Sequence, residues 1–265
     1  MSMPLLLCRP FRYDWGVNTT PVATRHSVFT TIVLHLLPGV LIAAIGGVAA
    51  YLLRDRGVPA YFVLEISVLV IMIPVMLGIM AVGRRAEGKE RLTQMVMRPD
   101  RRIKVWEYVV YPVIIVAFAA AVFTLIGDPV NAFFRNLLFP NLPAWADIGH
   151  VFERPEAYHS AWPVICWAVG AVLISLVGPI MEEFYFRGYL LPRIPGRPVA
   201  VIAAGVVLFA TYHVFSIWMA PVRIIALIPL VFAVWKTRSV AIGIIAHCLL
   251  NLVGDTIGLI PVVFG

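Results

Sequence analysis

The sequence predicts an all-α membrane protein, a polytopic helical bundle of about seven transmembrane helices within a range of six to eight. The first observation is composition. Of the 265 residues, 61% are hydrophobic and 13% charged, whereas soluble domains have roughly 45–50% apolar and about 25% charged residues. The second is that the apolar residues gather in blocks of about 20, the length a helix needs to cross a bilayer. The third is that these blocks do not alternate apolar and polar residues, as the strands of a membrane barrel would.

Seven apolar blocks follow one another along the chain. In order, they are Ser27–Leu53, Pro59–Val82, Tyr108–Gly127, Ala161–Leu191, Val199–Ala220, Val222–Trp235 and Val240–Ile257. The sixth block is short for a membrane-crossing helix, which favours a tilted or incomplete crossing.

The charges between the blocks predict an orientation. The loop from Arg84 to Lys104 carries eight basic residues against three acidic ones, and such an excess marks the cytoplasmic side. The stretch Asp128–Ser160 has more acidic than basic residues and is predicted to be external. Seven spans then place the N-terminus in the cytoplasm and the C-terminus outside, and only Arg54 and Arg56 disagree. We therefore expect a multi-pass integral membrane protein, in the cell membrane if the source is prokaryotic.

The net charge of +7 arises from basic residues in the short loops between the blocks, where they mark the cytoplasmic side. No nucleic-acid partner is therefore expected.

Ionisable side chains inside the apolar blocks are the candidate functional residues, because each costs at least ~2.5–3.5 kcal/mol in the bilayer. Three of them lie in one short segment of the fourth block, one lies in the fifth block, and a histidine with an asparagine lies in the last. They are Glu182, Glu183, Arg187, His213, His247 and Asn251.

Helical spacing separates the roles of these residues. Glu183 and Arg187 are four positions apart and share a face, so they are expected to pair. Glu182 points about 100° away from Glu183 and has no basic residue four positions away, so it is the freer carboxylate and the better general base. His247 and Asn251 are also four apart, a spacing suited to donating hydrogen bonds to a developing oxyanion.

The ordered motifs resemble a known family. They are Glu182-Glu183-x-x-x-Arg187, Phe209-x-x-x-His213 and His247-x-x-x-Asn251. This triplet is similar to the signature of the type II CAAX prenyl endopeptidase and bacteriocin-processing family, also called CPBP or ABI, whose members are glutamate-type intramembrane proteases. The resemblance covers roughly Ala161–Ile257.

The resemblance implies an intramembrane endopeptidase that hydrolyses a peptide bond of a membrane-associated protein or peptide, either prenylated or membrane-anchored. In this family Glu182 and His213 would activate water, and His247 with Asn251 would bind the oxyanion. Glu183 and Arg187 would support them. The implied partners are the lipid bilayer and the substrate.

Three parts of the chain are expected from these features. Residues 1–26 are a cytoplasmic N-terminal segment, residues 27–159 hold the N-terminal membrane helices and loops, and residues 160–265 form the catalytic membrane core of CPBP type. His35 and Glu65 lie alone in the first two blocks, and we interpret both as structural contacts between helices.

Two other functions stay open at this point. One is a non-proteolytic membrane scaffold or regulator of the same fold. The other is a proton-coupled transporter that uses the same acids and histidines as a relay.

A zinc site is a further alternative, because two histidines and two glutamates on neighbouring helices suit this metal. No His-x-x-x-His or His-Glu-x-x-His spacing occurs, however, and the resemblance favours a metal-independent mechanism. We therefore expect no cofactor.

Overall fold

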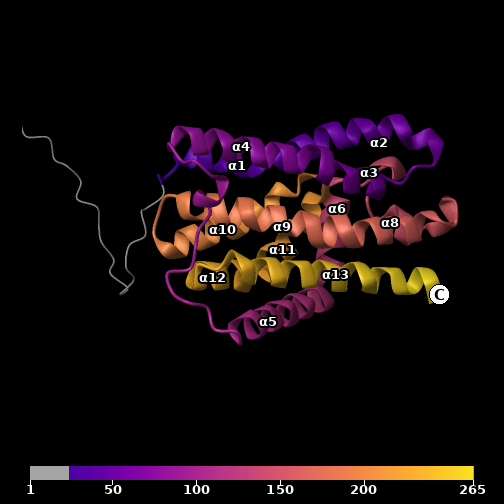
Figure 1. The fold of residues 1–265 in the computed structure, drawn as a ribbon. Helices are drawn as coiled ribbons and strands as arrows, with labels where there is room; N and C mark the ends of the chain where they lie inside the picture. The colour runs from indigo at the N-terminus through magenta and orange to yellow at the C-terminus, as the bar shows by residue number, and fades with distance from the viewer. Residues whose placement is uncertain (1–23, 265) are drawn as a thin grey trace, which may run out of the picture.

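The computed structural model describes residues 24–264, with side chains through Ile257. Every regular element in this part of the chain is a helix, which confirms the all-α prediction (Figure 1). Most of the predicted segment 1–26 lies outside the described residues.

The α-helices are α1 Val28–Leu41, α2 Gly47–Leu53, α3 Ala60–Ser67, α4 Ile73–Ala86, α5 Glu107–Val122, α6 Asp128–Leu138, α7 His150–Glu153, α8 Trp162–Val172, α9 Gly178–Glu182, α10 Pro198–Tyr212, α11 Ala220–Ala226, α12 Ile228–Thr237 and α13 Val240–Phe264. Wider π-helical turns join several of them: η1 Ile42–Gly46, η3 Val68–Met72, η5 Phe123–Gly127, η8 Leu173–Val177 and η9 Glu183–Leu190. Short 3₁₀ segments are η2 Arg54–Arg56, η4 Leu92–Gln94, η6 Ala144–Ala146, η7 Pro155–Ala157, η10 Leu191–Arg193 and η11 Val214–Met219.

Five continuous helices in the described part are long and apolar enough to cross a membrane. They are Val28–Arg56, Ala60–Ala86, Glu107–Leu138, Trp162–Arg193 and Val240–Ile257. At most 33% of the most apolar window of each is buried inside the protein, so their outer faces present apolar side chains to the surroundings. Lipid is the environment that such surfaces need. The chain is therefore an integral membrane protein.

The predicted fifth and sixth spans take a different form. The helices Pro198–Tyr212 and Val214–Ala226 meet at a bend of 118°, and α12 has only 10 residues, about 15 Å of helix. The predicted block Val222–Trp235 is broken at Leu227, between α11 and α12. The count of seven spans is thus not confirmed: the described helices supply five, or six if the bent pair is one span.

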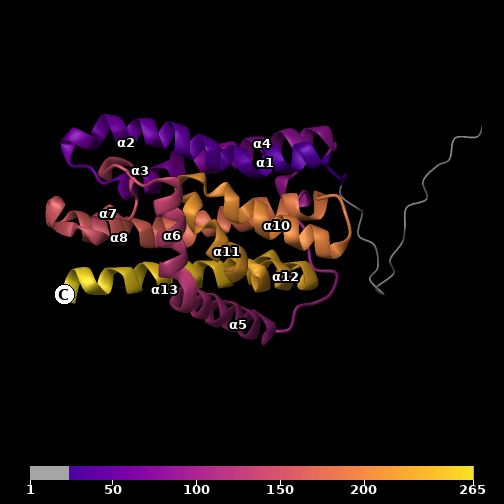
Figure 2. The same ribbon diagram turned by 180° about the vertical axis from the view of Figure 1, so that it is seen from behind.

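Local sequence explains the break. Prolines occupy the first turns of both α11 and α12, where the N–H that proline lacks would have had no partner within the helix. Inside one continuous helix, the proline of α12 would remove a hydrogen bond and clash with the preceding turn, so the two helices stay separate. Figures 1 and 2 show α10 and α12 in the same half of the bundle, near the loop that follows α4, with α11 closer to the middle. The segment from α10 to α12 therefore enters the bundle and returns.

The remaining helices form layers around this returning segment. α1 to α4 lie along one side, α5 lies along the opposite side, and α8, α9 and α13 run between them (Figure 1). α6 crosses the bundle at a steep angle to the other helices (Figure 2) and packs against η11. The packing of α1 on α10 is close, because a methyl group added to Gly39 would lie 1.6 Å from the carbonyl oxygen of Tyr212.

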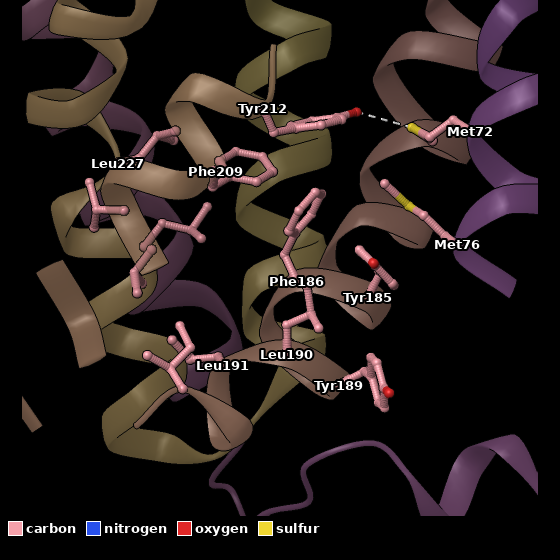
Figure 3. Packing of buried hydrophobic residues seen from close by; sticks show 14 of the residues in the cluster. Met72, Met76, Tyr185, Phe186, Tyr189, Leu190, Leu191, Phe209, Tyr212 and Leu227 are labelled. Carbon is pink, nitrogen blue, oxygen red and sulfur yellow. Dashed lines mark hydrogen bonds between the residues drawn. The ribbon is translucent and has the colours of Figure 1, made fainter. Parts of the chain in front are cut away.

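Aromatic and methionine side chains fill the core where these layers meet (Figure 3). Phe186 of η9 packs edge-to-face on Phe209 of α10 with ring centroids 5.0 Å apart, and its ring lies 4.7 Å from that of Tyr212. Met72 and Met76 are fully buried beside them. Such contacts fix the angle between η9, which carries Glu183 and Arg187, and α10, which is directly followed by His213.

Candidate active site

The two glutamates sit where an α-helix changes into a π-helix. Glu182 ends α9, and Glu183 begins η9, an eight-residue π-helix. Pro179 stands in the first turn of α9 and cannot donate a backbone hydrogen bond, and the π-helical turn η8 directly precedes it. Wide turns of this kind occur frequently at functional sites because they reorient side chains.

Glu182 is held by a residue from another helix. The hydroxyl of Tyr212 donates a hydrogen bond to Glu182 Oε1 at 2.7 Å. The same hydroxyl lies 3.1 Å from the sulfur of Met72, as Figure 3 shows, but its single hydrogen favours the carboxylate, the stronger acceptor. Glu182 is buried, yet it is the more accessible of the two glutamates, 8% exposed against 0% for Glu183. Glu182 has no basic partner on its own helix, as the spacing indicates, but sequence reasoning did not foresee its tyrosine partner from α10.

Glu183 and Arg187 form the ion pair that the spacing predicts. Arg187 Nη1 lies 3.1 Å from Glu183 Oε1, and both side chains are almost fully buried. The N–H groups of Arg187 are not aligned for hydrogen bonds to any described residue, so the contact is mainly electrostatic. The guanidinium carbon also lies 3.7 Å from the ring centroid of Phe209, a cation–π contact that helps to keep the charge inside the bundle.

His247 connects the two glutamates. Its Nδ1 lies 3.0 Å from Glu183 Oε1, and its Nε2 lies 3.7 Å from Glu182 Oε2. The hydrogen bond to Glu183 sets the orientation of the ring and so directs Nε2 toward Glu182. The approach of α13 depends on Gly243, since a methyl group there would lie 2.5 Å from Glu183 Oε2.

His213 directly follows the last residue of α10 and has a non-helical backbone conformation, with φ −74° and ψ 58°. Its Nδ1 is 3.0 Å from the carbonyl oxygen of Phe209, which leaves Nε2 for another partner. The ring of Phe209 stands between the two histidines, with its centroid 5.1 Å from that of His213 and 5.7 Å from that of His247. His213 therefore belongs to one cluster with Glu182, Glu183 and His247, although the ring of Phe209 separates it from His247.

Asn251 is one turn further along α13 and has a backbone partner. Its amide nitrogen donates to the carbonyl oxygen of Ile174 at 2.9 Å, inside the π-helical turn η8. One N–H of the amide stays free for another acceptor. The structure thus brings Glu182, Glu183 and His247 into direct proximity and attaches Asn251 to the neighbouring helix.

Sequence reasoning missed two polar residues of this cluster. One is Tyr212, the partner of Glu182. The other is Arg223 on α11, which donates to the carbonyl and hydroxyl oxygens of Ser216 at 3.1 and 2.9 Å and interacts electrostatically with Glu182. A signal for Arg223 was present, since it is the single charged residue of its apolar block.

The carboxylates and His247 are also the donors that a metal ion would use. Within the described residues, no group of three or more His, Cys, Asp or Glu side chains has the arrangement to hold one. Metal independence stays a prediction.

His35 has a local role in the described structure. Its Nδ1 lies 2.7 Å from the carbonyl oxygen of Thr31 on the same helix, and its ring packs 5.7 Å from that of Phe186.

The cluster lies within a segment that matches a known family. Residues 160–253 match the family described as type II CAAX prenyl endopeptidase, Rce1-like. This segment contains all six candidate residues, and the match covers about a third of the chain. The resemblance noted in the motifs is confirmed over this segment. No curated protein and no solved structure matches the chain significantly.

Proposed function

We propose that this protein is a glutamate-type intramembrane endopeptidase that cleaves a membrane-associated protein or peptide. The observation that carries the proposal is the contact of His247, on α13, with two buried carboxylates, Glu182 and Glu183, of the helix Trp162–Arg193. Buried ionisable groups are costly in a membrane domain, so they mark a candidate functional site. This cluster also lies inside the segment that matches the Rce1-like family.

The proposed first step is activation of water by Glu182. This carboxylate is the more accessible of the pair, and general-base action of a positioned group typically contributes ~10²–10⁴ in rate. The water oxygen attacks the carbonyl carbon of the scissile bond while its proton passes to Glu182. His213, with one ring nitrogen engaged by the Phe209 carbonyl, is proposed to assist through its other nitrogen.

The second step is stabilisation of the tetrahedral oxyanion by His247 and Asn251. Asn251 has one N–H left for this purpose beside its bond to Ile174. His247 must carry hydrogen on both ring nitrogens to donate from Nε2 while Nδ1 bonds to Glu183. The C–N bond then breaks, and the departing amine takes the proton held by Glu182. Glu183 and Arg187 position His247 rather than touch the substrate.

An apolar cavity beside the cluster supports a lipid-like or membrane-anchored substrate. It has a volume of about 250 Å³ and is lined mainly by η1, α2 and α3, with residues of and beside η6 and Phe215 of η11 completing the wall. The ring of Phe215 lies 5.6 Å from that of His213, so an apolar group in this cavity would end close to the catalytic cluster. Prenylated or membrane-anchored chains have this character.

The test uses purified protein in lipid nanodiscs with a prenylated peptide that carries a fluorophore and a quencher on either side of the cleavage site. Cleavage is expected with the unchanged protein and with Glu90→Gln, which alters an exposed carboxylate. It should fall by ~10²–10⁴ with Glu182→Gln. A proton-gradient-dependent flux in vesicles without cleavage would favour a transporter. A folded protein that cleaves no prenylated or membrane-anchored peptide would favour a scaffold.

A further inference from the structure

A second group of acidic residues lies in the bundle, apart from the glutamates of the catalytic cluster. Glu65 is on α3 and Asp255 is on α13. Asp255 is eight residues beyond His247, about 12 Å along the helix axis. α3, α8 and this part of α13 occupy the end of the bundle where the chain ends (Figures 1 and 2), whereas α10 and α12 occupy the other half.

Glu65 is buried without a hydrogen-bond partner. Its side chain is 0% exposed, and neither carboxylate oxygen has a hydrogen bond with any described residue. None of the ion pairs found among the described residues includes Glu65 or Asp255. An unpaired ionised carboxylate inside a membrane domain is costly, so Glu65 is stable there either as the protonated acid or with a bound cation beside it.

Hydroxyl groups complete an oxygen-rich site around Asp255. Ser175 donates to Asp255 Oδ2 at 2.5 Å, and Tyr61 donates to Asp255 Oδ1 at 3.4 Å. A methyl group added to Gly170 would lie 2.7 Å from Glu65 Oε1 and 3.5 Å from the Tyr61 hydroxyl. Both oxygens therefore border the same small space above the Gly170 backbone.

We propose that Glu65, Asp255, Ser175 and Tyr61 form a binding site for a hard metal cation, Na⁺ or Ca²⁺, held by oxygen atoms only. Two carboxylates can supply four oxygens and the hydroxyls two more, a donor set that suits hard cations. This set has two carboxylates and no histidine, so it differs in kind from the zinc site weighed for the catalytic cluster. The glycine at position 170 leaves the space that the cation needs.

Thermal unfolding of the full-length protein in detergent tests the proposal. Unfolding is followed in sodium chloride, in calcium chloride and in choline chloride at equal ionic strength. With one of the two metal ions the midpoint should rise with concentration, by roughly 5–10 °C at a hundredfold excess over Kd, because a ligand of the native state stabilises it by mass action. The arm that responds identifies the ion.

Variants locate the effect. Glu65→Gln and Asp255→Asn keep the side-chain size but remove a charge, and each should reduce the ion-dependent rise at least severalfold. Asp128→Asn is the matched control because Asp128 is exposed, and it should keep the full rise. An equal rise in Glu65→Gln and in the unchanged protein would place the ion elsewhere and overturn the proposal.

Isothermal titration of the unchanged protein covers the case in which a variant fails to fold. Saturable binding of about one Na⁺ or one Ca²⁺ per chain is expected, and Gly170→Ala, which keeps every oxygen but fills the space, should weaken it at least tenfold. No saturable binding of either ion, together with equal melting points in all three salts, would refute the site.

Discussion

At the scale of single residues, two adjacent glutamates have different surroundings. Glu182 accepts a hydrogen bond from Tyr212 and remains slightly exposed, whereas Glu183 contacts both Arg187 and His247 and is fully buried. A carboxylate that neutralises a buried cation is needed for stability, because its loss leaves that cation uncompensated. Glu182 accepts its hydrogen bond from a neutral hydroxyl and keeps some access, so it is better placed for chemistry.

The first prediction separates these two glutamates. Glu182→Gln should abolish most activity with little change in stability, since it keeps size and hydrogen bonding. Glu183→Gln should lose activity and also ~3–5 kcal/mol of stability, because Arg187 is left unpaired. Activity assays and thermal unfolding of both variants measure this. The double variant Glu183→Gln/Arg187→Gln should regain part of the stability but not the activity, because His247 has still lost its partner. A destabilised Glu182→Gln with a stable Glu183→Gln would exchange the two roles.

The second prediction concerns the tyrosine found beside Glu182. Tyr212→Phe removes one hydrogen bond to a carboxylate, an interaction worth about 1.5–3 kcal/mol, and should lower kcat by at least tenfold. Tyr185→Phe is the matched control, because this buried hydroxyl donates to the carbonyl of Leu34 instead. Steady-state kinetics would contradict the assignment if the two variants lost equal activity.

The third prediction concerns metal dependence of the catalytic cluster. Purified protein should keep its activity after prolonged treatment with a strong zinc chelator and contain well under one zinc per chain by elemental analysis. This expectation rests on the absence of a His-x-x-x-His or His-Glu-x-x-His spacing in the sequence. Loss of activity that is restored specifically by zinc would instead make His213 and His247 metal ligands.

At the scale of elements, the site depends on how closely α13 approaches the π-helix η9. The closest point is Gly243, where a methyl group would lie 2.5 Å from Glu183 Oε2 and 2.8 Å from a methyl carbon of Val234. Core packing tolerates such an insertion poorly, at a cost of typically ~1–3 kcal/mol. The position of His247, one turn further along α13, therefore follows from a glycine.

The fourth prediction tests this approach. Gly243→Ala should displace Glu183 from His247, lower thermal stability and reduce kcat. Gly254→Ala is the matched control on the same helix, since nothing lies within 4 Å of a methyl group there, and alanine favours helix over glycine by ~1 kcal/mol. It should leave activity unchanged. Equal kinetic effects of the two substitutions would show that the close approach is unimportant.

At the scale of the whole molecule, the segment α10–α12 decides how the chain crosses the membrane. If it enters and returns, as the bend of 118° and the short α12 indicate, then the basic residues before α10 and after α12 lie on one side of the membrane. They are Arg193, Arg197, Lys236 and Arg238. Two complete spans would place these residues on one side as well, so charge alone could not distinguish the two arrangements.

The fifth prediction concerns topology. A reporter fused after Arg91 should be cytoplasmic and one fused after Asp147 external, because of the charge bias of the Arg84–Lys104 loop. Reporters on the same side would contradict the number of crossings between them, and an inverted pair would contradict the orientation.

A cysteine at Ile217, in a background without other cysteines, should resist an impermeant external reagent, since η11 lies inside the bundle. Rapid labelling from outside would instead favour two complete spans.

The sequence alone determined the class of the molecule and the residues of its cluster. Long apolar blocks need a bilayer whatever their arrangement, and ionisable groups such as Glu182, Glu183 and His247 inside those blocks mark a site because of their cost. The pairing of Glu183 with Arg187 also followed, because a spacing of four brings two side chains together on one helix. Each of these inferences depends on composition or on local geometry.

Tertiary structure decided what depends on contacts between distant segments. Tyr212 reaches Glu182 from another helix, and His247 meets both glutamates only because α13 packs against η9 through Gly243. The return of the chain between α10 and α12 was likewise hidden, since an apolar run does not reveal where it bends. Local sequence fixes helical propensity and polarity, whereas packing across the bundle selects which polar groups share one space.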